Sequence, residues 1–428
     1  MKRFENKRIL VSVTGGIAAY KACDLIRMLY REGAAEVVAM MTPSAQQFVS
    51  ALTFETLTKS YVYSNNMENS SEGVPAHIAL AQDMDALIIL PCTANTLAKL
   101  AHGFADNIVT TTAMTFTGKP ITVVPTMNTR MWESPIVQKN LRTLAAMENM
   151  TIVPPDIGEL ACGEFGEGKL PDLETVLLYL YKSMHAHKNL FKDKRVVVTA
   201  GGTAEPIDAV RMMTNHSSGK MGIAIADELF AMGSDVLLLH TIPDISRPYR
   251  IIRMETTEDM ARYTQRNFKE ADGLVMAAAV ADFQVASEQK DLNTKIKKRD
   301  QLTLNLVKTQ DILTLVSSDK KEGQFMVGFA AESDHVLLHA REKLERKQLD
   351  MIVANDISRT DIGFGSDENE VTLLFRDKER IDLPKAEKQL IARQLLLHLY
   401  QKFLARREDD PEESVESLPE EQASDSSE

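Results

Sequence analysis

The feature that most constrains the fold is a pattern that occurs twice. Each half of the 428-residue chain begins with an apolar run that leads into a glycine pair, RILVSVTGG at residues 8–16 and RVVVTAGG at residues 195–202. Apolar runs and helical stretches then alternate along each half. Apolar strands without polar alternation, separated by helices, are typical of a parallel sheet covered on both faces. The sequence therefore predicts an α/β fold with two Rossmann-like parallel-sheet domains in tandem.

Individual elements follow from the same pattern. Strands are expected at 7–14, 36–42, 86–91, 121–126, 195–200, 234–240, 273–279, 325–331 and 350–356. Between the first two strands, helical spacing places Ile17, Ala22, Leu25, Ile26 and Leu29 on one face, and Gly33 is expected to end that helix. Near the C-terminus, a hairpin is expected at 371–383 and an amphipathic helix from Pro384 to about Arg407.

Composition divides the chain and limits its partners. The last 21 residues contain ten acids and no base, so the formal net charge of −12 falls to −2 for the rest. We expect domains at 1–187 and 188–407, followed by a disordered acidic tail at 408–428. A nearly neutral body without a basic stripe argues against nucleic-acid binding.

Targeting signals and cysteine usage point to one compartment. No apolar run approaches the ~20 residues that span a bilayer, and no signal-peptide pattern opens the chain. The three cysteines cannot form a disulfide framework and lack zinc-ligand spacing. These features predict a cytoplasmic protein without a membrane partner.

Candidate sites are expected in the loops that follow the strands, because ligands of open α/β sheets bind beyond the carboxyl ends of the strands. Neither glycine pair forms the G-x-G-x-x-G dinucleotide motif, although a glycine before a helix lets a phosphate approach backbone N–H groups. One loop, GELACGEFGEGKLPD at 158–172, places Cys162 among glycines and charges. A thiol in such a loop is more suited to chemistry than to core packing.

The first half contains the loop motifs TGGIAAYK (14–21), PCTANTLAK (91–99), PTMNTRMW (125–132), ACGEFGEGK (161–169) and VPAHIAL around His77. Together they resemble the FMN-dependent cysteine decarboxylase family. The second half contains TNHSSGKMG (214–222), AAAVADF (277–283), KIKK (295–298), GFAAES (328–333) and ANDIS (354–358), which resemble phosphopantothenate–cysteine ligase. Over residues 5–400 the fused pair is similar to bacterial bifunctional coenzyme A biosynthesis proteins.

The resemblance implies a decarboxylase that converts 4′-phosphopantothenoylcysteine to 4′-phosphopantetheine by FMN-mediated thiol oxidation, loss of CO₂ and re-reduction. Oxidation comes first because it places an electron sink β to the carboxylate. His77 would be the base, Asn128 would hold the substrate and Cys162 would be the acid. An Asx turn is the alternative role for Asn128. The positions implied for FMN are Gly16, Ile17, Ser44, Thr93, Ala94 and Asn95.

For the second half, the resemblance implies ligation of cysteine to 4′-phosphopantothenate through an acyl-cytidylate, with CTP and Mg²⁺. Asn215 would bind the acyl-cytidylate and Lys295 would stabilise the activation step. Asp282 would bind the base, the ribose or the metal; the metal ligands are otherwise unknown. The nucleotide positions implied are Met276, Ala277, Ala278, Asp282, Lys295, Gln310, Asp311, Ile312, Leu313, Phe329, Lys343 and Lys347. Gln310 departs from the family, which usually has proline there.

Oligomerisation and two rival functions complete the expectations. Trimeric decarboxylase domains and dimeric ligase domains in this family imply a homododecamer. One rival is a flavin-binding regulatory protein with an acidic tail, and another is an FMN oxidoreductase or flavin prenyltransferase. His77, Cys162 and an intact second half favour the bifunctional enzyme over both rivals.

Overall fold

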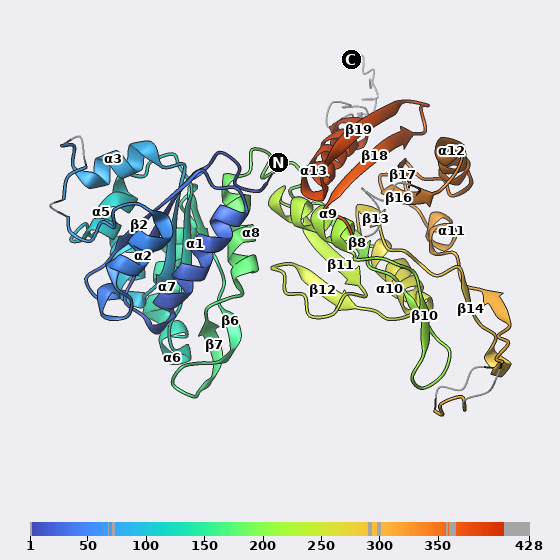
Figure 1. Ribbon diagram of the computed structural model, residues 1–428. Coiled ribbons are helices and arrows are strands. Elements are labelled where there is room, and N and C mark those ends of the chain that lie inside the picture. The colour runs from blue at the N-terminus through green and yellow to red at the C-terminus, as the bar shows by residue number, and fades with distance from the viewer. Residues whose placement is uncertain are drawn as a thin grey trace, which may run out of the picture.

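The computed structural model describes residues 2–66, 68–70, 73–289, 293–297, 301–356, 358 and 365–405. Each half of the chain has one large β-sheet with helices packed around it (Figure 1). This confirms the predicted fold class. The predicted tail at 408–428 lies outside the described residues.

The first sheet has five parallel strands in the order β2-β1-β3-β4-β5. The strands are β1 (Arg8–Val13), β2 (Glu36–Met41), β3 (Ala86–Cys92), β4 (Ile121–Pro125) and β5 (Met150–Ile152). The helices are α1 (Lys21–Arg31), α2 (Ala51–Thr58), α3 (Ala76–Asp83), α4 (Ala94–His102), α5 (Ile108–Thr115), α6 (Thr129–Trp132), α7 (Pro135–Ala145) and α8 (Leu173–Met184), with short 3₁₀ turns η1 (Ile17–Tyr20) and η2 (Ala45–Gln47). The hairpin β6 (Asp156–Glu159) and β7 (Phe165–Lys169) stands apart from the sheet.

The second sheet has eight strands in the order β12-β11-β8-β13-β16-β17-β18-β19, of which the first six are parallel. They are β8 (Arg195–Ala200), β11 (Asp235–His240), β12 (Arg250–Arg253), β13 (Gly273–Met276), β16 (Phe325–Glu332), β17 (Met351–Asp356), β18 (Glu368–Phe375) and β19 (Arg380–Glu387). The helices are α9 (Lys220–Ala231), α10 (Thr257–Phe268), α11 (Ile312–Ser317), α12 (Val336–Arg346) and α13 (Lys388–Leu399), with a 3₁₀ turn η3 (Ser287–Gln289) and a π turn η4 (Tyr400–Leu404). Two small ribbons pair β9 (Ala204–Pro206) with β10 (Met212–Thr214), and β14 (Phe283–Val285) with β15 (Leu306–Lys308).

Each central strand is apolar because both of its faces are covered. In β1, Ile9 and Val11 belong to the core that includes α1 and α8, whereas Leu10 belongs to the core on the opposite face. In β8, Val196 and Val197 divide in the same way between the two cores of the second half. Burial on alternate sides thus explains why the strands lack polar alternation.

Two local predictions need correction. Ile17 does not join the buried helix face: it is 59% exposed in η1, whereas the other four predicted residues of that face are buried. The C-terminal helix begins at Lys388 and not at Pro384, because residues 384–387 continue β19. Proline fits there since β19 is the edge strand of the sheet. Gly33, as predicted, follows the first helix, with a φ of 92°.

Candidate active sites

A large cavity lies in the first half beyond the carboxyl ends of β1, β2, β3 and β4. Its volume is about 1570 Å³, above the ~300–1000 Å³ typical of a pocket for one small molecule. Strand order reverses between β1 and β3, the place where open α/β sheets bind ligands. The predicted residues that line the cavity are Gly16, Ile17, Ser44, Thr93, Ala94, Asn95, Asn128 and Cys162.

The floor of this cavity is built from the loops after β1 and β3. A Cβ atom on Gly15 would lie 2.4 Å from Cβ of Ser44, so the loops after β1 and β2 approach closely only because residue 15 is glycine. The Thr14 hydroxyl donates to the Pro91 carbonyl at 2.7 Å and accepts from the Thr93 N–H at 3.0 Å. Helix α4 begins directly after Thr93. A glycine cradle beside a helix N-terminus fits the phosphate of a flavin nucleotide.

The hairpin β6–β7 carries Cys162 to this cavity. Two glycines of β7 let it pack directly on the loop that follows β4. A Cβ atom on Gly168 would lie 2.2 Å from the Met127 carbonyl oxygen, and one on Gly166 would lie 2.4 Å from Oγ1 of Thr129. Gly168 also has a φ of 127°, a conformation that favours glycine. The glycine-rich sequence therefore serves close packing of the hairpin.

Cys162 lies beside Asn128, in the turn between β6 and β7. The Asn128 side-chain amide donates to Sγ of Cys162 at 3.2 Å and to Oε2 of Glu164 at 2.7 Å. Its Oδ1 accepts the Arg130 backbone N–H at 2.9 Å, so Asn128 also caps α6. The two roles considered for Asn128, substrate contact and Asx turn, are compatible because they use different atoms of the amide.

Glu164 is a site residue that our sequence analysis missed. It accepts from Asn128, pairs with Arg130 at 2.9 Å and lies 3.9 Å from Sγ of Cys162. The hydrogen bond from Asn128 and the positive charge of Arg130 lower the pKa of Glu164. The carboxylate is therefore ionised at neutral pH and accepts the thiol hydrogen. Its position two residues after Cys162, within the ACGEFGEGK motif, was the available signal.

His77 is not brought into this group. It is the second residue of α3, and it is not among the described residues that line the cavity. Its Nδ1 is buried and has no hydrogen-bond partner among the described residues. One chain thus brings together the predicted acid and the substrate-holding amide, but not the predicted base.

In the second half, the predicted nucleotide residues gather where strand order reverses between β8 and β13. Met276 ends β13, and the Ala278 N–H that follows donates to the Thr199 hydroxyl at 3.1 Å. The Asn215 side chain donates to the Val280 carbonyl at 3.0 Å. The exposed Asp282 continues this loop, and its carbonyl accepts the Thr309 N–H at 3.0 Å.

The predicted cations of α12 are held by the protein itself. Lys343 donates to the Phe329 carbonyl at 2.7 Å, and Lys347 pairs with Asp311, which caps α11. Burial lowers the pKa of Lys343 and of Lys347, although the negative charge of Asp282 opposes this effect on both. Among the other predicted residues at α11, Gln310 precedes the cap, and Ile312 and Leu313 are buried in the first turn.

Lys295 lies outside that group. It is exposed in the segment 293–297, where the Ile296 N–H donates to the Asp208 carboxylate at 3.1 Å and the Thr294 carbonyl accepts the Ala209 N–H at 3.3 Å. This segment belongs to an arm, with β14 and β15, that projects beyond the sheet (Figure 1). Within the described ranges, no cluster of three or more His, Cys, Asp or Glu residues is arranged to hold a metal ion.

Comparisons with known proteins match both halves. The flavoprotein family model matches residues 2–185, and the model for the DNA/pantothenate metabolism flavoprotein C-terminal domain matches residues 191–403. The coenzyme A biosynthesis bifunctional protein CoaBC of Bacillus subtilis is 38% identical over 396 residues, which is 91% of this chain and 96% of that protein. The protein of the same name from Haemophilus influenzae is 35% identical, over 94% of this chain and 100% of its own.

Solved structures show partial similarity. The crystal structure of the C-terminal domain of a coenzyme A biosynthesis bifunctional protein CoaBC is 33% identical, with a TM-score of 0.43 over 52% of this chain and 100% of that domain. In addition, no helix in the described part of the chain is both long and apolar enough to cross a membrane.

Proposed function

The chain belongs to the family of coenzyme A biosynthesis bifunctional proteins, and from that premise we propose how its two halves divide the work. It is a flavoprotein enzyme with a phosphopantothenoylcysteine decarboxylase activity and a phosphopantothenate–cysteine ligase activity. We assign decarboxylation to the first half, with FMN as its cofactor. The observation that carries this assignment is the contact of Cys162 with Asn128 in a cavity that has a phosphate cradle.

Decarboxylation requires that the cysteine thiol of 4′-phosphopantothenoylcysteine be oxidised before CO₂ leaves. FMN bound at the glycine cradle would take up the electrons of this oxidation and return them after decarboxylation. Asn128 orients the substrate through its amide, which already contacts both Cys162 and Glu164. Cys162 then donates a proton to the unsaturated product, and Glu164 accepts the hydrogen bond of the thiol until transfer.

The second half would join cysteine to 4′-phosphopantothenate through an acyl-cytidylate formed from CTP. The support is a group of backbone amides, lysines and one exposed carboxylate at the strand ends, which suits a nucleotide phosphate. Mg²⁺ typically binds through one or two carboxylates together with substrate phosphates, so Asp282 is the carboxylate that fits it here. Lys295 would stabilise the activated phosphate.

We also propose that the enzyme is a homododecamer that works in the cytoplasm. His77 and Lys295 lie outside the groups they would serve, so neighbouring copies would supply them. Exposed apolar side chains that support such contacts include Ile17, Phe104 and Met131 in the first half, and Leu302, Leu306 and Val307 near the arm of the second. All three cysteines are free, in keeping with a reducing compartment.

The direct test supplies purified protein with 4′-phosphopantothenate, cysteine, Mg²⁺ and either CTP or ATP, followed by mass spectrometry of the products. We expect 4′-phosphopantetheine with CTP, and FMN released on denaturation. The chain with Cys162→Ser should still release CO₂ but accumulate a product two hydrogens short, because a hydroxyl is a far weaker acid than a thiol. Conversion by this variant at the parent rate would show that another group is the acid.

A further inference from the structure

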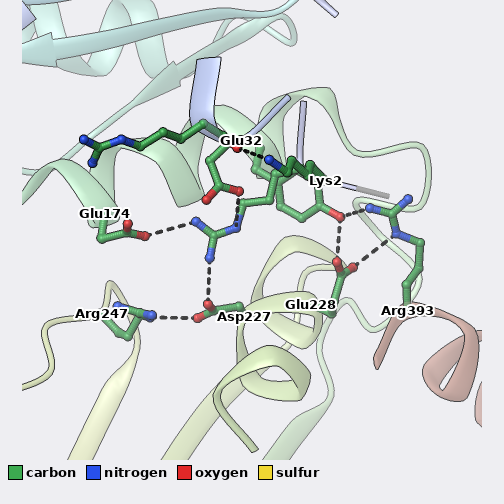
Figure 2. Close-up of polar contacts among 10 residues, drawn as sticks. Lys2, Glu32, Glu174, Asp227, Glu228, Arg247 and Arg393 are labelled. Atoms are coloured by element: carbon green, nitrogen blue, oxygen red, sulfur yellow. Dashed lines mark hydrogen bonds and ion pairs between the residues drawn. The ribbon is translucent and has the colours of Figure 1, made fainter. Parts of the chain in front are cut away.

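Two adjacent acids of α9 are buried between the halves of the chain. The side chains of Asp227 and Glu228 are 2% and 0% exposed. Asp227 accepts from Arg3 of the first half at 3.1 Å, and Glu228 accepts from the Tyr181 hydroxyl of α8 at 2.7 Å (Figure 2). Buried carboxylates are retained only with close partners. These contacts therefore fix how the halves lie together.

Asp227 is connected through Arg247 to the cavity of the first half, which we call the decarboxylase cavity. Oδ1 of Asp227 accepts from Nε of Arg247 at 2.9 Å and from the Tyr249 hydroxyl at 2.7 Å. Arg247 also donates to the Ser246 carbonyl at 2.9 Å. Ser246 belongs to the loop between β11 and β12 of the second half, yet it lines the cavity of the first half. A loop of the ligase half is thus part of that cavity.

Arg3 connects Asp227 to the part of the cavity wall that the first half itself provides. Residues 168–173 line it, and Glu174 follows directly in α8. Arg3 bridges the two walls, since it donates to Glu174 at 3.0 Å and to Asp227 at 3.1 Å (Figure 2). The β11–β12 loop begins beside the second half's glycines, where a Cβ atom on Gly201 would lie 2.1 Å from Oγ1 of Thr241. One loop therefore extends from the ligase strand ends to the decarboxylase cavity.

We propose that Ser246 forms part of the substrate-binding wall for 4′-phosphopantothenoylcysteine, and that Asp227 is a positioning residue that holds Ser246 there through Arg247. The inference rests on the proposed function of the first half. The proposed proton donor is Cys162, and Ser246 enters the cavity only as a wall residue of a neighbouring loop, so we assign it a contribution to binding and not to proton transfer. Disturbing the loop should consequently raise KM and leave kcat nearly unchanged.

The test uses the full chain with bound flavin and supplied 4′-phosphopantothenoylcysteine. Ser246→Trp places a bulky group in the cavity from an exposed loop position, where folding is not at risk. We expect KM to rise about tenfold or more, with kcat and the ligation rate within about twofold of the parent. Arg247→Ala should raise KM in the same way, and Arg247→Lys should restore part of the loss. Asp235→Asn, which breaks an exposed ion pair with Arg195 elsewhere in the second half, is the matched control and should match the parent.

A second measurement separates this inference from the proposed function. Titration with 4′-phosphopantetheine, followed by the absorbance of the bound flavin, needs no turnover. Weaker binding by Ser246→Trp than by the parent supports the inference, and equal binding overturns it. An unchanged KM in Ser246→Trp would also overturn it. Absence of turnover in the parent would instead contradict the proposed function. The titration would still test the inference, because it compares binding by Ser246→Trp and by the parent without turnover.

Discussion

The two halves place their sites at the same topological position but prepare them differently. In each, strand order reverses beside the first strand, and a glycine pair follows that strand. In the first half, Asn128 and Cys162 line a large cavity. In the second half, Lys343 and Lys347 bind a carbonyl and a carboxylate of the protein. The predicted acid and amide of the first half already contact each other, whereas nucleotide binding as proposed for the second half would replace the present contacts of the two lysines.

The largest expected difference between the two activities comes from a substitution at His77. His77→Asn should lower decarboxylation of supplied 4′-phosphopantothenoylcysteine by roughly 10²–10⁴-fold, the usual contribution of a general acid–base group. Ligation should be unchanged because the second site does not use this side chain. Steady-state assays of both activities measure the effect. His102→Asn, an exposed histidine in the last turn of α4, is the control and should leave both rates intact. Equal loss of both activities in folded His77→Asn would contradict the two-site assignment.

The converse test is Lys295→Ala, which should lower ligation by about 10²–10³-fold, as removal of a group that stabilises developing charge does. Decarboxylation should continue at the parent rate. Lys297→Ala in the same exposed segment separates a specific role from general positive charge. If both substitutions lowered ligation equally, the charge of the segment and not Lys295 would be responsible.

The contact between Asn128 and Cys162 depends on the hairpin that carries Cys162. Gly168→Ala would place Cβ against the Met127 carbonyl in a left-handed backbone conformation, a strain of about 1–3 kcal/mol. We expect the hairpin to shift and final product formation to fall about tenfold, with FMN content unchanged. Gly163→Ala is the matched control, because its φ is also positive but nothing lies within 4 Å of the added Cβ atom. Comparable losses of product formation in the two variants would show that the strained backbone conformation, and not the packing against Met127, causes the loss.

The smallest expected effect concerns the pH dependence of nucleotide binding. Burial lowers the pKa of Lys343, so its ammonium form is lost at a lower pH than for an ordinary lysine. Attraction for the anionic nucleotide should weaken as pH rises through that lowered pKa. Lys343→Arg should remove this weakening, since arginine stays charged. Calorimetric titration with CTP from about pH 7 to about pH 10 should show a few-fold difference at the upper end. An identical pH dependence in both proteins would exclude Lys343 from the phosphate contact.

Much of each half could be predicted because strands of a covered parallel sheet are apolar along their whole length. All nine strands expected in the two sheets are present, and so is the hairpin of β18 and β19. The three-residue strands β9, β10, β14 and β15 escaped prediction, because a strand of that length is too short to show a hydrophobic pattern. Pro384 misled the prediction for α13 because an edge strand and a helix start both accept proline.

The sequence by itself determined the alternation of elements, the glycines at the strand ends and the motifs that place the chain in its family. These features are local, and periodicity and backbone freedom decide them. Only the tertiary structure decided that Glu164 contacts Asn128, that His77 is not among the described residues lining the first half's cavity, that the segment of Lys295 lies in an arm beyond the second sheet, and that Ser246 lines the other half's cavity. Contacts between distant segments depend on how the cores and the buried charges of α9 bring the halves together, and no local pattern encodes that placement.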